Sequence, residues 1–349
     1  MPARSYRFVQ VDVFTDRVFG GNPLAVFLDA RGLDDALMQR IAREMNLSET
    51  VFLFPPLRSD CAAALRIFTP AREVPFAGHP TVGTAWVLAA HGMAPKGASG
   101  FVLEERIGPV PVELEGDATH PDFIWMTHQD AVFDPALENR DAVARALDLS
   151  EADLWPGAPV QPGSTGSKFL FVPLRDRPAV DRATLDVRAL LDAMGPRPHL
   201  GVFVFAPDRD PAAGRVYSRM FAPHTSGIPE DPATGSASGP LGAYLVLNGL
   251  VRTAARSESS ASRGRGWAAR ASSTFGSRWT ARRSRRSASV EAWCPCSKGI
   301  CGSHVLPRGG KRRRRSRRGQ MRGGARRLQA RRTLSTLSLQ PRAPQAASS

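Results

Sequence analysis

The sequence predicts a mixed α/β fold composed of two related halves, followed by a long basic segment of different character. Three observations lead to this prediction. Strand-like apolar runs recur along the first part of the chain and are interrupted by apolar runs of helical length. A pair of short motifs occurs twice with nearly constant spacing. Charge and composition change abruptly after Arg252. The part before Arg252 is long enough for one large core or two smaller ones.

The first half is expected to combine antiparallel strands with two helices. Asp34–Met45 has apolar residues at helical spacing, and Asn46 suits its C-terminal end. Thr81–His91 is an apolar segment that Pro80 would open as a helix. Gly20–Pro23 has the composition of a turn. The expected strands are Tyr6–Phe14, Leu24–Leu28, Thr50–Phe54, Ala63–Phe68, Gly100–Leu103, Val110–Leu114 and Phe123–Thr127.

The second half is expected to use the same types of element. The expected strands are Phe169–Pro173, Gly201–Ala206 and Arg215–Met220, and the expected helices are Asp141–Leu147, Ala189–Met194 and Ala233–Leu247. The last of these is apolar like Thr81–His91 and would be its counterpart. We expect domains at residues 1–120 and 121–252, with a tail at 253–349. No Gly/Ser linker separates the halves, so they should pack tightly.

The repeat links two segments that lie far apart in the sequence. Arg66–Pro70 is followed by Gly78–Ala85, and Arg219–Pro223 is followed by Glu230–Ala237. The first members are offset by 153 residues and the second members by 152. This spacing predicts one structural unit used twice, with a cleft between the two copies.

The repeat would place His79 and Asp231 at equivalent points, each followed by a proline. Proline favours the first helical turn, so both side chains are expected at helix N-termini, where backbone N–H groups attract anions. Two such termini facing each other would bind a carboxylate or a developing enolate. Each residue also has a plainer interpretation: Asp231 as an ordinary helix cap and His79 as a hydrogen-bonded structural histidine. Ser236 is either a small helix residue or a hydroxyl that reaches the same pocket.

Glu49 is a third candidate, because it lies between a helix end and an apolar strand. A glutamate at such a junction is commonly a solvated loop residue. If it enters an apolar cleft instead, its pKa rises and it can act as a general base and then as an acid.

The basic character of the chain comes from the tail alone. After Arg252 there are 24 Lys and Arg residues against 2 acidic ones, whereas the preceding part holds 23 against 30. The tail is rich in Arg, Ser, Gly and Ala and contains the basic run Lys311–Arg318, so it is expected to be disordered. Three interpretations are open: an anion-binding tail for nucleic acid or membrane, a neutral appendage, or a shifted reading frame.

We favour the reading-frame interpretation on the genetic code. Read two nucleotides later, the possible codons of Trp293–Gly299 permit Val-Pro-Val-Leu-Glu-Gly, a strand-like run before a turn. Arg265–Ser272 permits a similarly globular string. Any binding of nucleic acid through the tail would then be incidental to its arginine content.

Cysteine usage and hydropathy limit the class of protein. Cys61 is alone in the first 252 residues, and the spacing of Cys294, Cys296 and Cys301 lacks a paired metal-binding arrangement. Neither a metal site nor a disulfide framework is therefore expected, which fits a cytoplasmic protein. The N-terminus has no apolar signal-peptide core, and no apolar stretch is long enough for a transmembrane helix, so no membrane association is expected.

The candidate residues lie in strings that resemble the PhzF family of phenazine-biosynthesis isomerases, which share the diaminopimelate epimerase-like fold. The resemblance covers about residues 5–251. The matching strings are Asp12–Thr15, Gly20–Val26, Asn46–Thr50, Phe76–Thr81 and Glu230–Ala237. It implies two pseudo-symmetric domains, each with a curved sheet around a central helix, a homodimer, and a site between the domains. The final strands of the second domain would be lost where the chain departs from the family pattern after Arg252.

The resemblance implies that Glu49 shuttles a proton on a small cyclic or allylic carboxylic acid, without cofactor or metal. His79 and Asp231 would assist catalysis, and the substrate would contact Ser48, Gly78, Gly235 and Ser236. The family's phenazine member isomerises 2,3-dihydro-3-hydroxyanthranilate. In related epimerases two cysteines supply the acid and the base; here Ala77 and Pro232 are expected at those positions, which argues against an amino-acid epimerase or racemase. Three alternatives remain: an amino-acid epimerase or racemase, a nucleic-acid binder acting through the tail, and an inactive frameshifted product.

Overall fold

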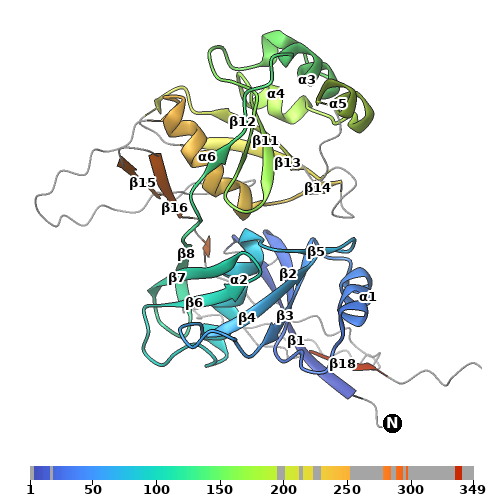
Figure 1. Cartoon of the computed structure of the whole chain (residues 1–349), viewed down its shortest axis with the longest axis vertical. Coiled ribbons are helices and arrows are strands. Elements are labelled where there is room, and N and C mark those ends of the chain that lie inside the picture. Colours follow the sequence, from blue (N-terminus) through green and yellow to red (C-terminus); the bar gives the residue numbers. More distant parts are fainter. Residues whose placement is uncertain are drawn as a thin grey trace, which may run out of the picture.

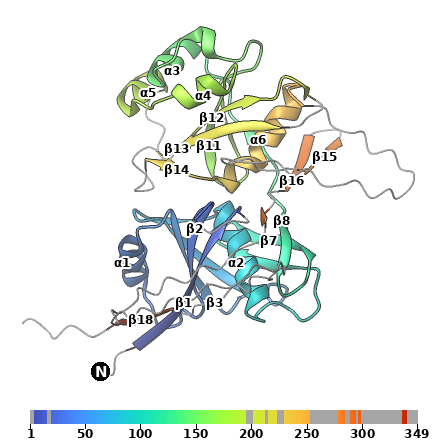
Figure 2. The ribbon, with the colours of Figure 1, turned by 180° about the vertical axis from the view of Figure 1, so that it is seen from behind.

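The computed structural model describes residues 4–15, 19–194, 201–211, 215–222 and 229–251, together with four short strands at 278–283, 288–293, 296–297 and 335–339. Figures 1 and 2 show two bodies stacked along the long axis, one around helix α2 (Gly78–Ala90) and one around helix α6 (Gly235–Leu247). The mixed α/β fold predicted from the sequence is confirmed.

The first body is a curved sheet around a central helix. Its strands are β1 (Arg4–Val13), β2 (Asn22–Phe27), β3 (Glu49–Phe54), β4 (Ala63–Phe68), β5 (Glu73–Val74), β6 (Gly100–Glu105), β7 (Gly108–Gly116) and β8 (Pro121–Met126). They follow the order β8-β7-β6-β4-β3-β2-β1, with β5 paired to β4. Every residue of α2 is buried. A helix that is apolar all round requires cover on all sides, and the curvature of the sheet provides it.

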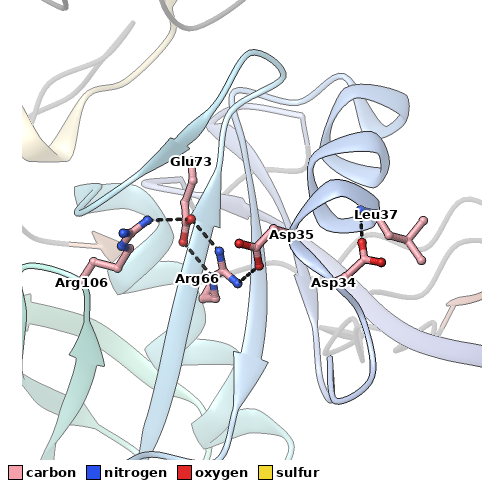
Figure 3. Close-up of polar contacts among 6 residues, drawn as sticks. All are labelled: Asp34, Asp35, Leu37, Arg66, Glu73 and Arg106. Carbon is pink, nitrogen blue, oxygen red and sulfur yellow. Dashed lines mark hydrogen bonds and ion pairs between the residues drawn. The ribbon is translucent and has the colours of Figure 1, made fainter.

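The amphipathic helix α1 (Asp35–Met45) covers the outside of the same sheet through Met38, Ile41 and Ala42. Asp34 caps its N-terminus by accepting a hydrogen bond from the N–H of Leu37 at 2.7 Å (Figure 3). Asn46 ends the helix in the left-handed conformation, with φ of 51°, as the sequence predicted.

The second body repeats this plan with fewer strands. Its sheet has the order β14-β13-β12-β11-β10-β9. The strands are β9 (Val132–Phe133), β10 (Gln161–Ser164), β11 (Lys168–Pro173), β12 (Gly201–Pro207), β13 (Val216–Phe221) and β14 (Glu230–Asp231). The outer helices are α3 (Arg140–Ala146), η1 (Glu151–Asp153), α4 (Arg177–Arg182) and α5 (Val187–Met194). Eleven of the 13 residues of α6 are buried against this sheet and its surroundings.

Strands β10 to β14 of the second body correspond in order to β1 to β5 of the first body. β2–β3 and β11–β12 are parallel pairs, and each is followed by an antiparallel partner, β4 or β13. β4 and β13 are offset by 153 residues, as the sequence repeat indicated, but β5 and β14 and the two helices are offset by 157. The connection between β13 and β14 is therefore four residues longer than the one between β4 and β5.

This longer connection corrects two predictions. His79 corresponds in structure to Ser236, and Asp231 corresponds to Val74, so His79 and Asp231 are not equivalent. By the same offset, Ala77 corresponds to Thr234 and not to Pro232. The alignment of His79-Pro80 with Asp231-Pro232 failed because it assumed connections of equal length.

The same arginine–glutamate contact occurs in both bodies and supports the corrected alignment of the two bodies. Arg66 makes a two-pronged contact with Glu73, with Nε–Oε1 at 2.8 Å and Nη2–Oε2 at 2.7 Å, and Asp35 and Arg106 extend the network (Figure 3). Arg219 contacts Glu230 in the same way, with both distances 2.8 Å. Each arginine thus ties the short strand that precedes a central helix to the strand beside it.

Among the described residues, the second sheet has no counterparts of β6, β7 and β8. In the first body β6 runs parallel to β4, whereas among the described strands β13 pairs only with β12 and the two-residue β14. β15 (Arg278–Arg283) and β16 (Ala288–Trp293) form a separate hairpin, and β16 lies against α6 (Figures 1 and 2). β17 (Cys296–Ser297) and β18 (Ser335–Leu339) pair with β8 and β1. The remainder of 253–349 lies outside the described residues, so the disordered tail stays a prediction.

β8 pairs with β7 and thus belongs to the first sheet. We therefore propose that the first domain ends after Met126, a few residues later than the boundary at 120/121 expected from the sequence.

Candidate active site

The two central helices begin directly opposite each other, where the two bodies meet. A Cβ placed on Gly78 would lie 2.4 Å from the carbonyl carbon of Gly235 and from the nitrogen of Ser236. Only glycine permits this approach of the two backbones. Neither helix has a side-chain cap, because its N-cap residue, Ala77 or Thr234, makes no capping hydrogen bond.

These opposed helix ends favour an anion. Backbone N–H groups of the first helical turns have no partner within their own helix, and both helix dipoles place partial positive charge at the same point. A cavity of about 80 Å³ lies beside them and is lined by residues of both bodies. Its lining includes Glu49, His79, Asp231, Gly78, Gly235 and Ser236.

Glu49 and His79 face each other in this cavity. Glu49 is the first residue of β3 and His79 the second residue of α2, and Glu49 Oε2 lies 3.3 Å from His79 Nδ1. The His79 side chain is only 3% exposed and that of Glu49 only 17%. Nδ1 also lies 3.2 Å from the amide nitrogen of Asn22. The tautomer decides the role of Nδ1: a protonated Nδ1 donates to an ionised Glu49, whereas an unprotonated Nδ1 accepts a hydrogen bond.

Asp231 enters the same cluster from the second body. Its Oδ1 accepts a hydrogen bond from Asn22 Nδ2 at 2.7 Å, and its Oδ2 accepts one from Thr234 Oγ1 at 2.5 Å. Asn22 also donates to the carbonyl of Ala233 at 2.9 Å. A fully buried asparagine of the first body thus holds the acidic residue of the second body in place.

Burial shifts the pKa of all three ionisable groups toward their neutral forms. Desolvation, followed by the nearby charge of Asp231, raises the pKa of Glu49 well above its usual value. Desolvation raises the pKa of Asp231 to about 6, although hydrogen bonds from Thr234, Asn22 and Ser48 act in the opposite direction. Desolvation lowers the pKa of His79 to about 3, so the imidazole is neutral at physiological pH. Burial therefore favours the protonated form of both carboxyl groups and the neutral form of the imidazole.

Six of the seven residues selected from the sequence line one cavity, and Ser48 does not. Ser48 is buried beside Asp231, and its side chain makes a hydrogen bond to the Asp231 carboxylate that lowers the pKa of that group. Asp231 lies in β14, and Thr234 is the N-cap of α6, so the interpretation of Asp231 as an ordinary helix cap is wrong. Sequence reasoning missed the roles of Asn22 and Thr234. The signals available for Asn22 were its place in the Gly20–Pro23 turn before an apolar strand and in the family-matching string Gly20–Val26.

A second buried acid lies behind the first turn of α2. Glu105 at the end of β6 is 5% exposed, and desolvation raises its pKa to about 8. Thr81 Oγ1 lies 2.5 Å from Glu105 Oε1 and 2.8 Å from the carbonyl of Ala77. A hydroxyl has one proton, so both contacts are hydrogen bonds only when a protonated Glu105 donates to Thr81.

The fold and site define a two-domain, epimerase-like enzyme. A PhzF family protein from Bacillus anthracis matches with a TM-score of 0.66 at 22% identity, over 84% of this chain and 97% of that one. A predicted epimerase from Pseudomonas aeruginosa matches with a TM-score of 0.61 at 29% identity, over 84% and 96%. A probable proline racemase from Agrobacterium radiobacter shares the fold, with a TM-score of 0.57 at 14% identity.

The chain belongs to the PhzC-PhzF family of phenazine biosynthesis-like proteins, whose model matches residues 11–270. Its curated relatives are isomerases. The trans-2,3-dihydro-3-hydroxyanthranilate isomerase of Pseudomonas aeruginosa is 39% identical over 69% of this chain and 80% of the relative. An uncharacterised isomerase of Clostridium acetobutylicum is 35% identical over 71% and 82%. The predicted family and its isomerase class are confirmed.

The described ranges contain no group of three or more His, Cys, Asp or Glu side chains arranged to hold a metal ion. None of their helices has the length and apolar character needed to cross a membrane.

Proposed function

We propose that this chain is a cofactor-independent isomerase that moves a proton between two carbons of a small unsaturated carboxylic acid. The observation that carries the proposal is the contact between Glu49 and His79 beside the opposed N-termini of α2 and α6. A carboxyl group with a raised pKa can act as the base and then the acid of such a reaction, and the helix N-termini can stabilise the developing negative charge.

The geometry supports a simple sequence of steps. The substrate carboxylate binds at the two helix N-termini, and ionised Glu49 removes a proton from a neighbouring carbon. The electron pair of the broken C–H bond shifts into the conjugated system, and its developing charge is stabilised by the same N–H groups. Glu49, now protonated, returns the proton to a different carbon of the same system. His79 stays neutral and orients Glu49, while Asn22 and Thr234 fix Asp231.

The names of the relatives indicate the first substrate to test. Two of them, from Pseudomonas aeruginosa and Pseudomonas fluorescens, are trans-2,3-dihydro-3-hydroxyanthranilate isomerases at 39% and 38% identity. This compound has one carboxylate next to a cyclohexadiene ring and so fits the proposed chemistry.

Amino-acid epimerisation is less well supported. If the N-cap positions of the two central helices carried the acid and the base of an epimerase, those residues here would be Ala77 and Thr234. Neither side chain can act as an acid or a base at neutral pH.

Deuterium incorporation tests the proposal. The chain is incubated with trans-2,3-dihydro-3-hydroxyanthranilate in deuterated water, and incorporation at carbon is followed by NMR. We expect Glu49→Gln to reduce the rate at least ~100-fold, because general acid–base catalysis contributes about that much. The exposed Glu44 of α1 provides the matched control, Glu44→Gln, which should exchange at the wild-type rate. Equal rates for Glu49→Gln and wild type would show that Glu49 is not the base.

A further inference from the structure

One basic side chain of the cavity is not used by the proposed reaction. Arg72 lies in the short connection between β4 and β5 and lines the cavity together with Glu49 and His79. Its backbone is held firmly: the N–H of Arg72 donates to Thr69 Oγ1 at 3.1 Å, and Thr69 Oγ1 donates to the carbonyl of Arg72 at 3.0 Å.

Helix α1 fixes the same connection from outside. Gln39 Nε2 donates to the carbonyls of Thr69 and Pro70 at 2.9 and 3.1 Å. The position from which the Arg72 side chain extends is therefore set before any ligand binds, which reduces the entropy lost on binding.

The guanidinium of Arg72 has no acidic partner among the described residues. Its Nε is buried without a hydrogen bond, and burial lowers the pKa of Arg72 with no carboxylate to offset the effect. The adjacent Glu73 is already occupied by Arg66 and by Arg106, whose Nη1 lies 2.8 Å from Glu73 Oε2 (Figure 3). Arg72 as a whole is only partly buried, but its Nε is a buried donor without a partner, which is unfavourable, and an anionic ligand would relieve this cost.

The other basic residue of the cavity differs in this respect. Lys168 Nζ lies 2.9 and 3.1 Å from the two carboxylate oxygens of Asp134, so its charge is already paired. Arg72 is thus the cavity cation whose charge is available, and the helix N-termini of Gly78 and Gly235 are a separate anion-binding position.

We propose that Arg72 forms a second anion subsite, and that the preferred substrate of this chain is a small dicarboxylic acid. One carboxylate binds at the opposed helix N-termini and the other forms a two-pronged pair with the guanidinium. The inference rests on the proposed function for the location of the reacting carbons, but the binding of a diacid is measurable independently of catalysis.

Binding of planar probe acids tests the subsite. The full chain is titrated calorimetrically with benzoate and with benzene-1,2-, 1,3- and 1,4-dicarboxylate. At least one diacid should bind about tenfold more tightly than benzoate, because a hydrogen-bonded pair with a charged group contributes about that factor. Arg72→Gln should remove this advantage and leave benzoate binding unchanged, and Arg72→Lys should restore part of it.

Lys168→Gln is the matched control, because it removes one positive charge from the same cavity and should preserve the diacid preference. The proposal is overturned if no diacid binds more tightly than benzoate to the wild type, or if Arg72→Gln keeps the preference. A chain with an Arg72-dependent diacid preference but no Glu49-dependent deuterium exchange would retain the subsite and refute the isomerase proposal. Glu49-dependent deuterium exchange without an Arg72-dependent diacid preference would refute the subsite and leave the isomerase proposal standing.

Discussion

Gly78 and Gly235 touch across the boundary between the two bodies, so closely that a Cβ on Gly78 would come within 2.4 Å of the backbone of the other helix. This contact brings the N-terminal ends of the two central helices together. The geometry of the site therefore depends on both residues being glycine, because neither has a side chain.

Gly78→Ala should therefore separate the two helix ends. We expect kcat/KM for deuterium exchange to fall about 100-fold, because displacements of about 1 Å have effects of this size. The control is Gly249→Ala, which meets no atom within 4 Å but has a φ of +66°. It should lower the free energy of unfolding by about 1 kcal/mol and leave kcat/KM unchanged. Equal activity of Gly78→Ala and wild type would refute the importance of the contact.

The pH dependence of kcat/KM should reflect Glu49 and not His79. Glu49 must be ionised to remove a proton, and its pKa is raised, so activity should increase with pH until that carboxyl is ionised. The pKa of His79 is about 3, so no change near pH 6.5 should arise from the imidazole. The measurement is the rate of deuterium exchange between pH 4 and 9. A pH profile of Glu49→Gln identical to that of the wild type would contradict the assignment.

Asn22→Asp should disrupt the link between the two bodies. The change replaces a donor by an acceptor 2.7 Å from Asp231 Oδ1 and 2.9 Å from the carbonyl of Ala233. We expect a loss of about 1–3 kcal/mol in the free energy of unfolding, measured in urea, because buried acceptors are left facing each other. Asn248→Asp is the control, since Asn248 donates to a carbonyl at 2.8 Å at the end of α6, away from the cavity. It should change the free energy of unfolding by less than about 1 kcal/mol.

Glu105→Gln should make the protein more stable at alkaline pH. The folded-state pKa of Glu105 is raised from 4.5 to about 8, so the folded protein retains this proton where the unfolded chain has lost it. The contribution of Glu105 to stability is complete below pH 4.5 and is lost as pH rises toward 8. Glutamine keeps a donor for Thr81 without a charge. The variant should match the wild type at pH 4.5 in urea unfolding and exceed it at pH 9; no difference at pH 9 would show that Glu105 is not buried as an acid.

The reading frame of the C-terminal segment can be tested directly. The curated relatives extend beyond the matched region, which covers 79–82% of their lengths, and no described strand of the second sheet is a counterpart of β6 to β8. We expect DNA resequencing across the codons of residues 240–305 to reveal a single-base insertion or deletion. The corrected chain should unfold at a higher urea concentration than the present one. A confirmed frame together with full exchange activity would refute this interpretation.

The elements around the site were largely predictable because their signals are local. Asn46 in the left-handed conformation and the apolar segments of α2 and α6 follow from residue type and periodicity. Which side chains meet in the site was harder to predict from the sequence. Asn22 and Asp231 are separated by 209 residues, and only the internal repeat and the resemblance to a known family placed Asp231 in the site.

The two copies of the repeat were misaligned for the same reason, because sequence signals are local. Sequence matching aligned the prolines after His79 and Asp231, but the folded chain aligns β5 with β14 and inserts the extra residues before β14. Nothing in the sequence indicated a role for Arg72 or Glu105. Their burial and their lack of ion-pair partners among the described residues depend on contacts between segments that are far apart in the chain.

The opposed ends of α2 and α6 have a mechanical consequence. They belong to different bodies of one chain, so an anion held by both is a noncovalent cross-link. Its binding free energy adds to the cohesion between the bodies, and the ligand and the tertiary structure strengthen each other. Occupancy of the site should thus make the two bodies melt together, whereas the empty protein leaves each body closer to its own intrinsic stability.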